Sequence, residues 1–184
     1  MRLFAALPVS GAAREELAGV IERLSREAWP VRWARPEGLH LTVKFLGEVP
    51  PEREPSIAQA LAGAVTGMTP LPLAAREFGG FPTLERARVL WCGYDAEPAL
   101  ELLVDRVERA FEALGFAVEG RPFRAHVTLG RVREGGRLPA AGVTELDALR
   151  PTADFTAEAL VLYQSVSAPG GPRYTPRLTL PFGG

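Results

Sequence analysis

The stretch "GLHLTVKFLG" at residues 38–47 and the stretch "RAHVTLGRVR" at residues 124–133 share the pattern His-x-Thr. His40 and His126 are the two histidines of the chain, and both occur in this frame. Successive side chains of a β-strand point to opposite faces, so each histidine shares a face with the threonine two residues later. The Leu and Val residues between them face the other way. We therefore expect two strands, each with one polar face and one apolar face.

The two motifs belong to an internal repeat. A shift of 86 residues superposes residues 2–42 on residues 88–128 without a gap and matches ten identical residues, more than the composition predicts by chance. In each copy a short apolar strand precedes a segment with helical periodicity, and a His-x-Thr strand follows. The expected fold class is α+β and bilobal. Two pseudo-symmetric lobes, each containing a β-α-β unit and an antiparallel-rich sheet, would enclose an active-site groove between them.

The remaining elements follow from apolar periodicity and from turn residues. Ser10 is the expected N-cap of the first helix, and Gly115 the expected stop of the third. A turn is expected at "GGFP", residues 79–82, and a loop over residues 134–142. Helices are predicted over residues 10–29, 50–65 and 98–115, and strands over residues 2–7, 39–47, 71–78, 88–94, 125–132, 155–166 and 173–182.

Length and composition favour one domain over residues 1–184 with a packed core, because 47% of the residues are hydrophobic and 23% are charged. The single cysteine, Cys92, excludes an intramolecular disulfide. No apolar run is long enough for a transmembrane helix, and the apolar start before Pro8 is too short for a signal peptide. We therefore expect a cytoplasmic monomer without an obligate protein partner. The net charge of −1 indicates no global surface for long nucleic acid.

Pseudo-twofold symmetry would bring the two polar strand faces together, and two imidazoles and two hydroxyls would converge. That set suits in-line displacement at phosphorus, where one histidine accepts a proton and the other donates one. Both can act near neutral pH because histidine titrates around pH ~6.5. The hydroxyls of Thr42 and Thr128 can hydrogen-bond the non-bridging phosphate oxygens. The motifs therefore predict phosphodiester chemistry with His40 and His126 as the acid–base pair.

Two cations are candidate phosphate ligands beside these motifs. Arg131 lies five residues after His126, so strict alternation places it on the opposite face, but a bulge at Gly130 would return it. Lys44 lies four residues after His40 and is in phase with it. No Asp, Glu or Cys lies two residues from either histidine, so no metal site and no cofactor are expected.

The sequence resembles the 2H phosphoesterase superfamily, which is named for two H-x-[T/S]-x motifs on a duplicated scaffold. Within it, the chain is similar to the RNA 2′,3′-cyclic phosphodiesterases, also called 2′-5′ RNA ligases. The resemblance covers nearly the whole chain. It is carried by "RLFAAL", "HLTVKFLGEV", "FPTLERARVLWCG", "FRAHVTLGRV", "LVLYQSV" and "GGPRYTP".

This resemblance implies a role for each matched residue. His40 would be the proton donor, His126 the proton acceptor, and Thr42, Thr128 and Arg131 the phosphate ligands. The implied reaction opens a terminal 2′,3′-cyclic phosphate of RNA to a 2′-phosphomonoester without a metal. The resemblance also implies reversible 2′-5′ joining of RNA ends.

Other functions stay open at the level of sequence. The chain could be a non-catalytic module that binds nucleotides or RNA ends in the same groove. It could also be a phosphodiesterase for small cyclic nucleotides or an ADP-ribose cyclic phosphate. Tyr163 and Tyr174 match the late part of the family pattern, where core packing and stacking on a base are both compatible with the sequence.

Overall fold

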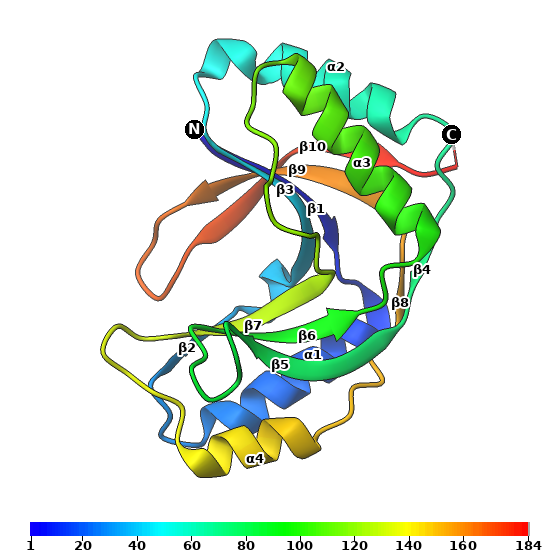
Figure 1. Ribbon diagram of the computed structural model, residues 1–184. Helices are drawn as coiled ribbons and strands as arrows, with labels where there is room; N and C mark the ends of the chain where they lie inside the picture. Colours follow the sequence, from blue (N-terminus) through cyan, green and yellow to red (C-terminus); the bar gives the residue numbers. More distant parts are fainter. Residues whose placement is uncertain (184) are drawn as a thin grey trace.

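The computed structural model describes residues 1–183 and contains one strongly bent sheet with helices on its outer sides (Figure 1). The strands are β1 (Arg2–Pro8), β2 (Val31–Trp33), β3 (His40–Glu48), β4 (Leu71–Leu73), β5 (Ala75–Phe81), β6 (Val89–Tyr94), β7 (His126–Val132), β8 (Phe155–Ala157), β9 (Ala159–Val166) and β10 (Arg173–Pro181). The helices are α1 (Gly11–Ser25), α2 (Glu54–Val65), α3 (Pro98–Ala113) and α4 (Ala140–Ala148), with 3-10 turns η1 (Pro36–Gly38) and η2 (Pro51–Arg53).

The main sheet has the strand order β10-β9-β1-β3-β7-β6-β5, and β2 also pairs with β7. Every pairing is antiparallel, and β4 and β8 form a separate two-stranded sheet. We call strands β10, β9, β1 and β3 the β3 half, and strands β7, β6, β5 and β2 the β7 half. The predicted α+β fold with antiparallel strands is confirmed. The two lobes share one continuous sheet instead of having a sheet each.

The two halves join at a single backbone pair, Leu41 on β3 with Val127 on β7. These residues are equivalent under the 86-residue shift of the repeat. Equivalent residues that face one another in an antiparallel pair lie on either side of a local twofold axis perpendicular to the sheet. Strands β1 and β6 flank the pair in equivalent places, and β9 and β5 lie beyond them. The repeat therefore takes the form of a pseudo-twofold centred between the His-x-Thr motifs.

Each helix of the repeat packs on the opposite half from the strand that precedes it. Helices α2 and α3 cover the outer side of the β3 half, whereas α1 and α4 lie against the β7 half (Figure 1). The two expected lobes, each with a β-α-β unit, therefore exchange their helices. Strands β1 and β3 are antiparallel neighbours, so their connection leaves and returns beside the twofold axis. From there α1 reaches the adjacent half, where Leu17 and Leu24 are fully buried.

The predicted turn at residues 79–82 is wrong, because Gly79, Gly80 and Phe81 continue strand β5. A Cβ atom at Gly79 would lie 2.4 Å from the ring of Trp91 on the neighbouring strand. Gly79 is therefore explained by the space that the flat indole ring of Trp91 needs. A pair of glycines in the sequence is compatible both with such a strand and with a turn, so the sequence alone did not distinguish them.

Other boundaries also differ from the predicted ones. Helix α4 begins inside the predicted loop, and its weak pattern has only Gly142 and Leu146 buried. Helix α1 ends at Ser25 rather than at residue 29, and Ser10 precedes it in an extended conformation without a side-chain cap bond. The predicted strands 71–78 and 155–166 are each divided in two. Among residues 1–183, no helix has the length and apolarity that a membrane crossing requires.

Candidate active site

The histidines lie at the centre of the concave face of the sheet. The Tyr174 ring on edge strand β10 is 5.0 Å from the His40 ring, and the Phe81 ring on edge strand β5 is 5.0 Å from the His126 ring. Neighbouring strands are about 4.8 Å apart, so β10 lies about 14 Å from β3 in a flat sheet. Such contacts require the sheet to curve around the histidines. The opposite face carries Leu41 and the rest of the core.

Both imidazole rings are held in the same way. The Nδ1 atom of His40 lies 2.7 Å from the carbonyl oxygen of Gly38, and Nδ1 of His126 lies 2.7 Å from the carbonyl oxygen of Arg124. A carbonyl oxygen only accepts, so each Nδ1 carries the hydrogen and donates it. This arrangement fixes the tautomer and leaves each Nε2 free for proton exchange with a ligand. The sequence did not predict these bonds, which come from the backbone two residues before each histidine.

The histidines are close enough to influence one another. They are diagonal across the Leu41–Val127 pair, positions that are about 7–8 Å apart in a regular antiparallel ladder. Burial lowers the pKa of His40, and the charges of His126 and Arg131 lower it further, against the bond to Gly38. Burial also lowers the pKa of His126, again with a contribution from Arg131. Both rings are therefore mainly neutral at pH 7 before a ligand binds.

Thr42 and Thr128 lie on the same face as the histidines, as the alternation predicted. Both side chains are half-buried, whereas Leu41 and Val127 between them are fully buried. Within residues 1–183, neither threonine hydroxyl makes a hydrogen bond to a protein group. The two hydroxyls are thus available to a ligand that lies over the histidines.

Arg131 reaches the histidine face because strand β7 contains a bulge. Leu90 of β6 pairs with Gly130, whereas Trp91 pairs with Thr128, so Leu129 is the extra residue. One extra residue reverses the alternation beyond it, and Arg131 returns to the face of the histidines. The Gly130 bulge was foreseen from the sequence. Burial is the largest cause of the lowered pKa of both histidines, and the charge of Arg131 lowers both further. Arg131 is therefore within electrostatic reach of both rings.

Lys44 is the one candidate that the structure directs elsewhere. Strand β3 has the equivalent bulge, because Ala5 pairs with Lys44 while Ala6 pairs with Thr42. The bulge turns Lys44 to the helix-covered side, where its Nζ atom lies 2.7 Å from Glu108 Oε2. Only 7% of the Lys44 side chain is exposed. The predicted phase with His40 was wrong, because the bulge in β3 moves Lys44 off the histidine face, whereas the equivalent bulge in β7 brings Arg131 onto it.

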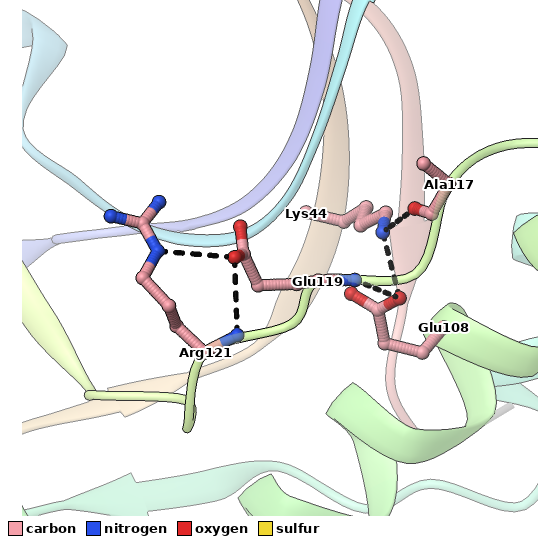
Figure 2. A network of polar contacts seen from close by, with 5 residues as sticks. All are labelled: Lys44, Glu108, Ala117, Glu119 and Arg121. Carbon is pink, nitrogen blue, oxygen red and sulfur yellow. Dashed lines mark hydrogen bonds and ion pairs between the residues drawn. The ribbon is translucent and has the colours of Figure 1, made fainter.

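The Lys44 ion pair anchors the segment that leads into the second motif (Figure 2). Lys44 donates to Glu108 on α3 and to the carbonyl oxygen of Ala117, and the amide of Glu119 also donates to Glu108. Glu119 in turn accepts from the backbone and side chain of Arg121. These contacts fix residues 117–121 against β3, a few residues before His126. Lys44 therefore stabilises the geometry of the site from the helix-covered side of the sheet.

The surroundings of the two histidines are aromatic and unequal. His40 packs against Phe4, Tyr163 and Tyr174 at ring distances of 4.8 to 6.1 Å. His126 packs against Phe81, which in turn contacts Trp91. Sequence patterns indicated the two tyrosines but not Phe81, because its strand was expected to end earlier. Among residues 1–183, no group of three or more His, Cys, Asp or Glu side chains is placed to hold a metal ion.

The fold and the site define a class of protein: two twofold-related His-x-Thr strands that present imidazole, hydroxyl and guanidinium groups on one concave face. The family model described as LigT like Phosphoesterase matches residues 7–91 and 94–174. The chain belongs to this family, which is a family of phosphoesterase enzymes. The family resemblance stated from the motifs is thereby confirmed.

Named relatives and solved structures cover almost the whole chain. An RNA 2′,3′-cyclic phosphodiesterase of Archaeoglobus fulgidus is 31% identical over 174 residues, which are 95% of this chain and 96% of the relative. One of Thermotoga maritima is 28% identical over 95% of this chain and 91% of the relative. The crystal structure of E. coli LigT with 3′-AMP has a TM-score of 0.76 at 26% identity and covers 100% of this chain and 98% of that one. The crystal structure of a Thermus thermophilus protein has a TM-score of 0.80 at 26% identity, covering 100% of this chain and 99% of that one.

Proposed function

We propose that this enzyme hydrolyses the terminal 2′,3′-cyclic phosphate of RNA to a 2′-phosphomonoester. The observation that carries the proposal is the pair of twofold-related imidazoles, each fixed at Nδ1 and free at Nε2, on one face with Arg131. Two such groups on opposite sides of one phosphorus are the arrangement that in-line displacement needs. The names of the relatives from Archaeoglobus fulgidus and Thermotoga maritima support the same reaction.

In the proposed mechanism, neutral His126 accepts a proton at Nε2 from the attacking water. The new P–O bond forms as the bond from phosphorus to the 3′ oxygen breaks, and protonated His40 donates its Nε2 proton to that oxygen. Thr42 and Thr128 donate hydrogen bonds to the non-bridging oxygens, and Arg131 compensates the charge that develops there. The bound phosphate anion raises the pKa of His40, which burial had lowered, and so keeps the acid protonated when substrate is present.

Ligation would use the same two groups. A 5′-hydroxyl in place of water would attack the cyclic phosphate and form a 2′-5′ linkage, with the acid and base roles unchanged. We propose this ligation as a second activity of the site. We also propose that neither reaction needs a metal or a protein partner, because the acid, the base and the phosphate ligands all come from this chain.

The test is substitution of each histidine. We expect His40→Ala and His126→Ala each to lower kcat on an RNA with a 2′,3′-cyclic phosphate by about 10²- to 10⁴-fold, because each removes one proton transfer. Far-UV circular dichroism checks that both variants fold, and chromatography identifies the product as a 2′- or a 3′-phosphate. Near-wild-type turnover in either variant, or loss of wild-type activity in EDTA, contradicts the mechanism.

A non-catalytic binding module is the second candidate function. In its favour, the E. coli LigT crystal structures in complex with 3′-AMP, ATP and NADP⁺ are complexes of nucleotides with a protein of this fold. Tight binding of nucleotides by this protein without any product would favour that candidate. Equal turnover of an ADP-ribose cyclic phosphate and an RNA end would favour the small-molecule alternative.

A further inference from the structure

Six exposed arginines gather at the end of strand β7. Strand β7 ends between β2 and β6, since Arg131 pairs with Arg32 on one side and with Val89 on the other. The loops between β5 and β6 and between β7 and α4 lie at this same end of the β7 half (Figure 1). The members of this arginine cluster are Arg32, Arg86, Arg88, Arg131, Arg133 and Arg137.

The arginine cluster begins at the histidines and extends away from them. Burial raises the pKa of the Tyr174 hydroxyl, and the charges of Arg131 and Arg32 oppose that rise, so both guanidinium groups are within electrostatic reach of Tyr174. Tyr174 packs edge-on against His40. On the other side, the backbone of Arg88 accepts a hydrogen bond from Val132. The charges therefore continue from the histidine face across the end of the sheet.

The far part of the arginine cluster lines an open cavity of about 290 Å³. Arg86, Arg88 and Arg137 line it, and Arg88 is held there by donating to the carbonyl oxygen of Gly136. Three guanidinium groups around one open cavity provide many donors and no acceptor among themselves. Such a cavity suits an anion with several oxygens, and phosphate is the anion that arginine binds with two parallel hydrogen bonds.

No carboxylate neutralises the arginine cluster through an ion pair within residues 1–183. The ion pairs found within residues 1–183 involve cations outside the arginine cluster, for example Arg76 with Asp95 and Arg177 with Glu54. Two glutamates, Glu85 and Glu134, lie in the same loops as the cluster. Hydrogen bonds from its own backbone and from Thr83 lower the pKa of Glu85, and the charge of Arg86 lowers it further, so Glu85 offsets part of the positive charge without forming an ion pair. The positive charge is thus concentrated at one end of the molecule although the net charge of the chain is −1.

We infer that the arginine cluster binds the phosphates of the RNA strand that precedes the terminal cyclic phosphate. The inference rests on the proposed function, which places the cyclic phosphate between the histidines. The cluster spans three adjacent strands, about 10 Å, and continues into two loops, so a single phosphate cannot contact it all. A mononucleotide would reach Arg131 but not the cavity, whereas an oligonucleotide would occupy both. The substrate class is therefore an RNA chain rather than a small cyclic nucleotide.

Kinetics on two substrates test this inference. The combined variant Arg86→Gln, Arg88→Gln and Arg137→Gln leaves the histidines, the threonines and Arg131 unchanged. For an eight-nucleotide RNA with a 2′,3′-cyclic phosphate, we expect its kcat/KM to fall about tenfold at moderate salt. The slope of log kcat/KM against log salt should also become about 2 units less negative, since each single-strand phosphate contact contributes about 0.7. For 2′,3′-cyclic AMP, we expect a change of less than twofold.

The matched control removes the same charge elsewhere. Arg76→Gln, Arg106→Gln and Arg109→Gln alter three arginines at the other end of β5 and on α3, which covers the β3 half. The control should keep the RNA activity of the wild type. Equal losses in both triple variants would show a general charge effect and overturn the inference. An unchanged RNA activity in the cavity variant would overturn it as well.

Binding separates this inference from the proposed function. Fluorescence anisotropy with a labelled eight-nucleotide RNA that ends in a 2′-phosphate needs no turnover. An affinity about tenfold weaker in the cavity variant than in the control supports the arginine cluster, even if the wild-type protein hydrolyses neither substrate. Equal affinities for the two variants overturn it, even if hydrolysis is confirmed.

Discussion

His40 and His126 are nearly equivalent by symmetry, yet the mechanism needs one acid and one base. What differs is the residue that follows each bulge. Arg131 follows the bulge of β7, and the equivalent residue of β3 is Phe45, an exposed aromatic side chain that packs on Phe4. In the proposed mechanism, a cation on one side and an aromatic surface on the other would give the substrate one direction across the twofold axis. This asymmetry would then account for the unequal roles proposed for the two equal motifs.

The charge of Arg131 also contributes to the pH dependence, after burial. Burial lowers the pKa of both histidines, and Arg131 lowers both further, so the free enzyme should show a bell-shaped kcat/KM profile with its maximum below pH 6.5. The variant Arg131→Gln removes a charge that disfavours protonation. Its two apparent pKa values should therefore rise, and the whole bell should move to higher pH. We also expect kcat/KM to fall about 10²-fold at the optimum because a phosphate ligand is lost.

A pH series of kcat/KM for the wild type and Arg131→Gln measures both effects. Arg131→Lys is the matched control, since it retains the charge and should retain the position of the bell. A bell that stays in place in Arg131→Gln would mean that Arg131 does not act on the histidines. The same lowered pKa values predict that the contribution of the two histidines to folding stability is fully present above pH 6.5. This contribution declines as the pH falls below that value, because the unfolded chain then binds more protons than the folded one.

At the scale of the element, the two bulges determine which face of the sheet the later side chains occupy, and strict alternation alone does not predict this. The strand positions of His40, Thr42, His126 and Thr128 could be predicted because they precede the bulges, where a period of two holds. Beyond the bulge the side chains change face, and the prediction for Lys44 was wrong for that reason. A glycine marked the bulge in β7, whereas no residue of β3 gave such a signal.

The register of the repeat changes within each unit as well. The ladder sets Pro8 opposite His40 and Gly93 opposite His126, so strands β1 and β6 correspond with an offset of 85 residues. The sequence repeat was aligned without a gap at an offset of 86, which fits the His-x-Thr strands. A one-residue difference in the connection is invisible in a count of identities. Only backbone pairing reveals it.

The structural role of Lys44 is tested by its removal. Lys44→Met removes the ammonium donor that the half-buried carboxylate of Glu108 and the carbonyl oxygen of Ala117 share, and we expect a loss of about 2–4 kcal/mol in the free energy of unfolding. Urea denaturation measures this loss. Arg121→Gln is the control from the same network, because its ion pair with Glu119 is exposed and should contribute less than about 1 kcal/mol.

Kinetics distinguish this role from the one predicted by the sequence. At urea concentrations below those that unfold it, the Lys44→Met variant should keep a KM close to that of the wild type. A raised KM with unchanged stability would instead indicate that the ammonium group contacts the substrate.

At the scale of the whole molecule, the exchange of helices joins the two halves. Helix α1 follows β1 of the β3 half but covers the β7 half, and α3 follows β6 but covers the β3 half. The apolar periodicity that predicted these helices corresponds to their buried faces, since Leu17, Leu24, Leu103 and Val107 are all at 0% exposure. It did not predict against which strands they pack, because an apolar face specifies burial but not its partner. One core cluster runs through both halves as a consequence.

This exchange predicts that residues 1–184 behave as one domain, which we propose on that basis. Trp29, Trp33 and Trp91 all belong to the β7 half or its helix contacts, so tryptophan fluorescence reports the unfolding of that half. Far-UV circular dichroism reports both halves. Neither half can keep its helices while the other is unfolded, so the two signals should give one urea transition with the same midpoint and slope. Separate midpoints would mean that the halves fold independently, and the shared core would then not couple the two histidine strands.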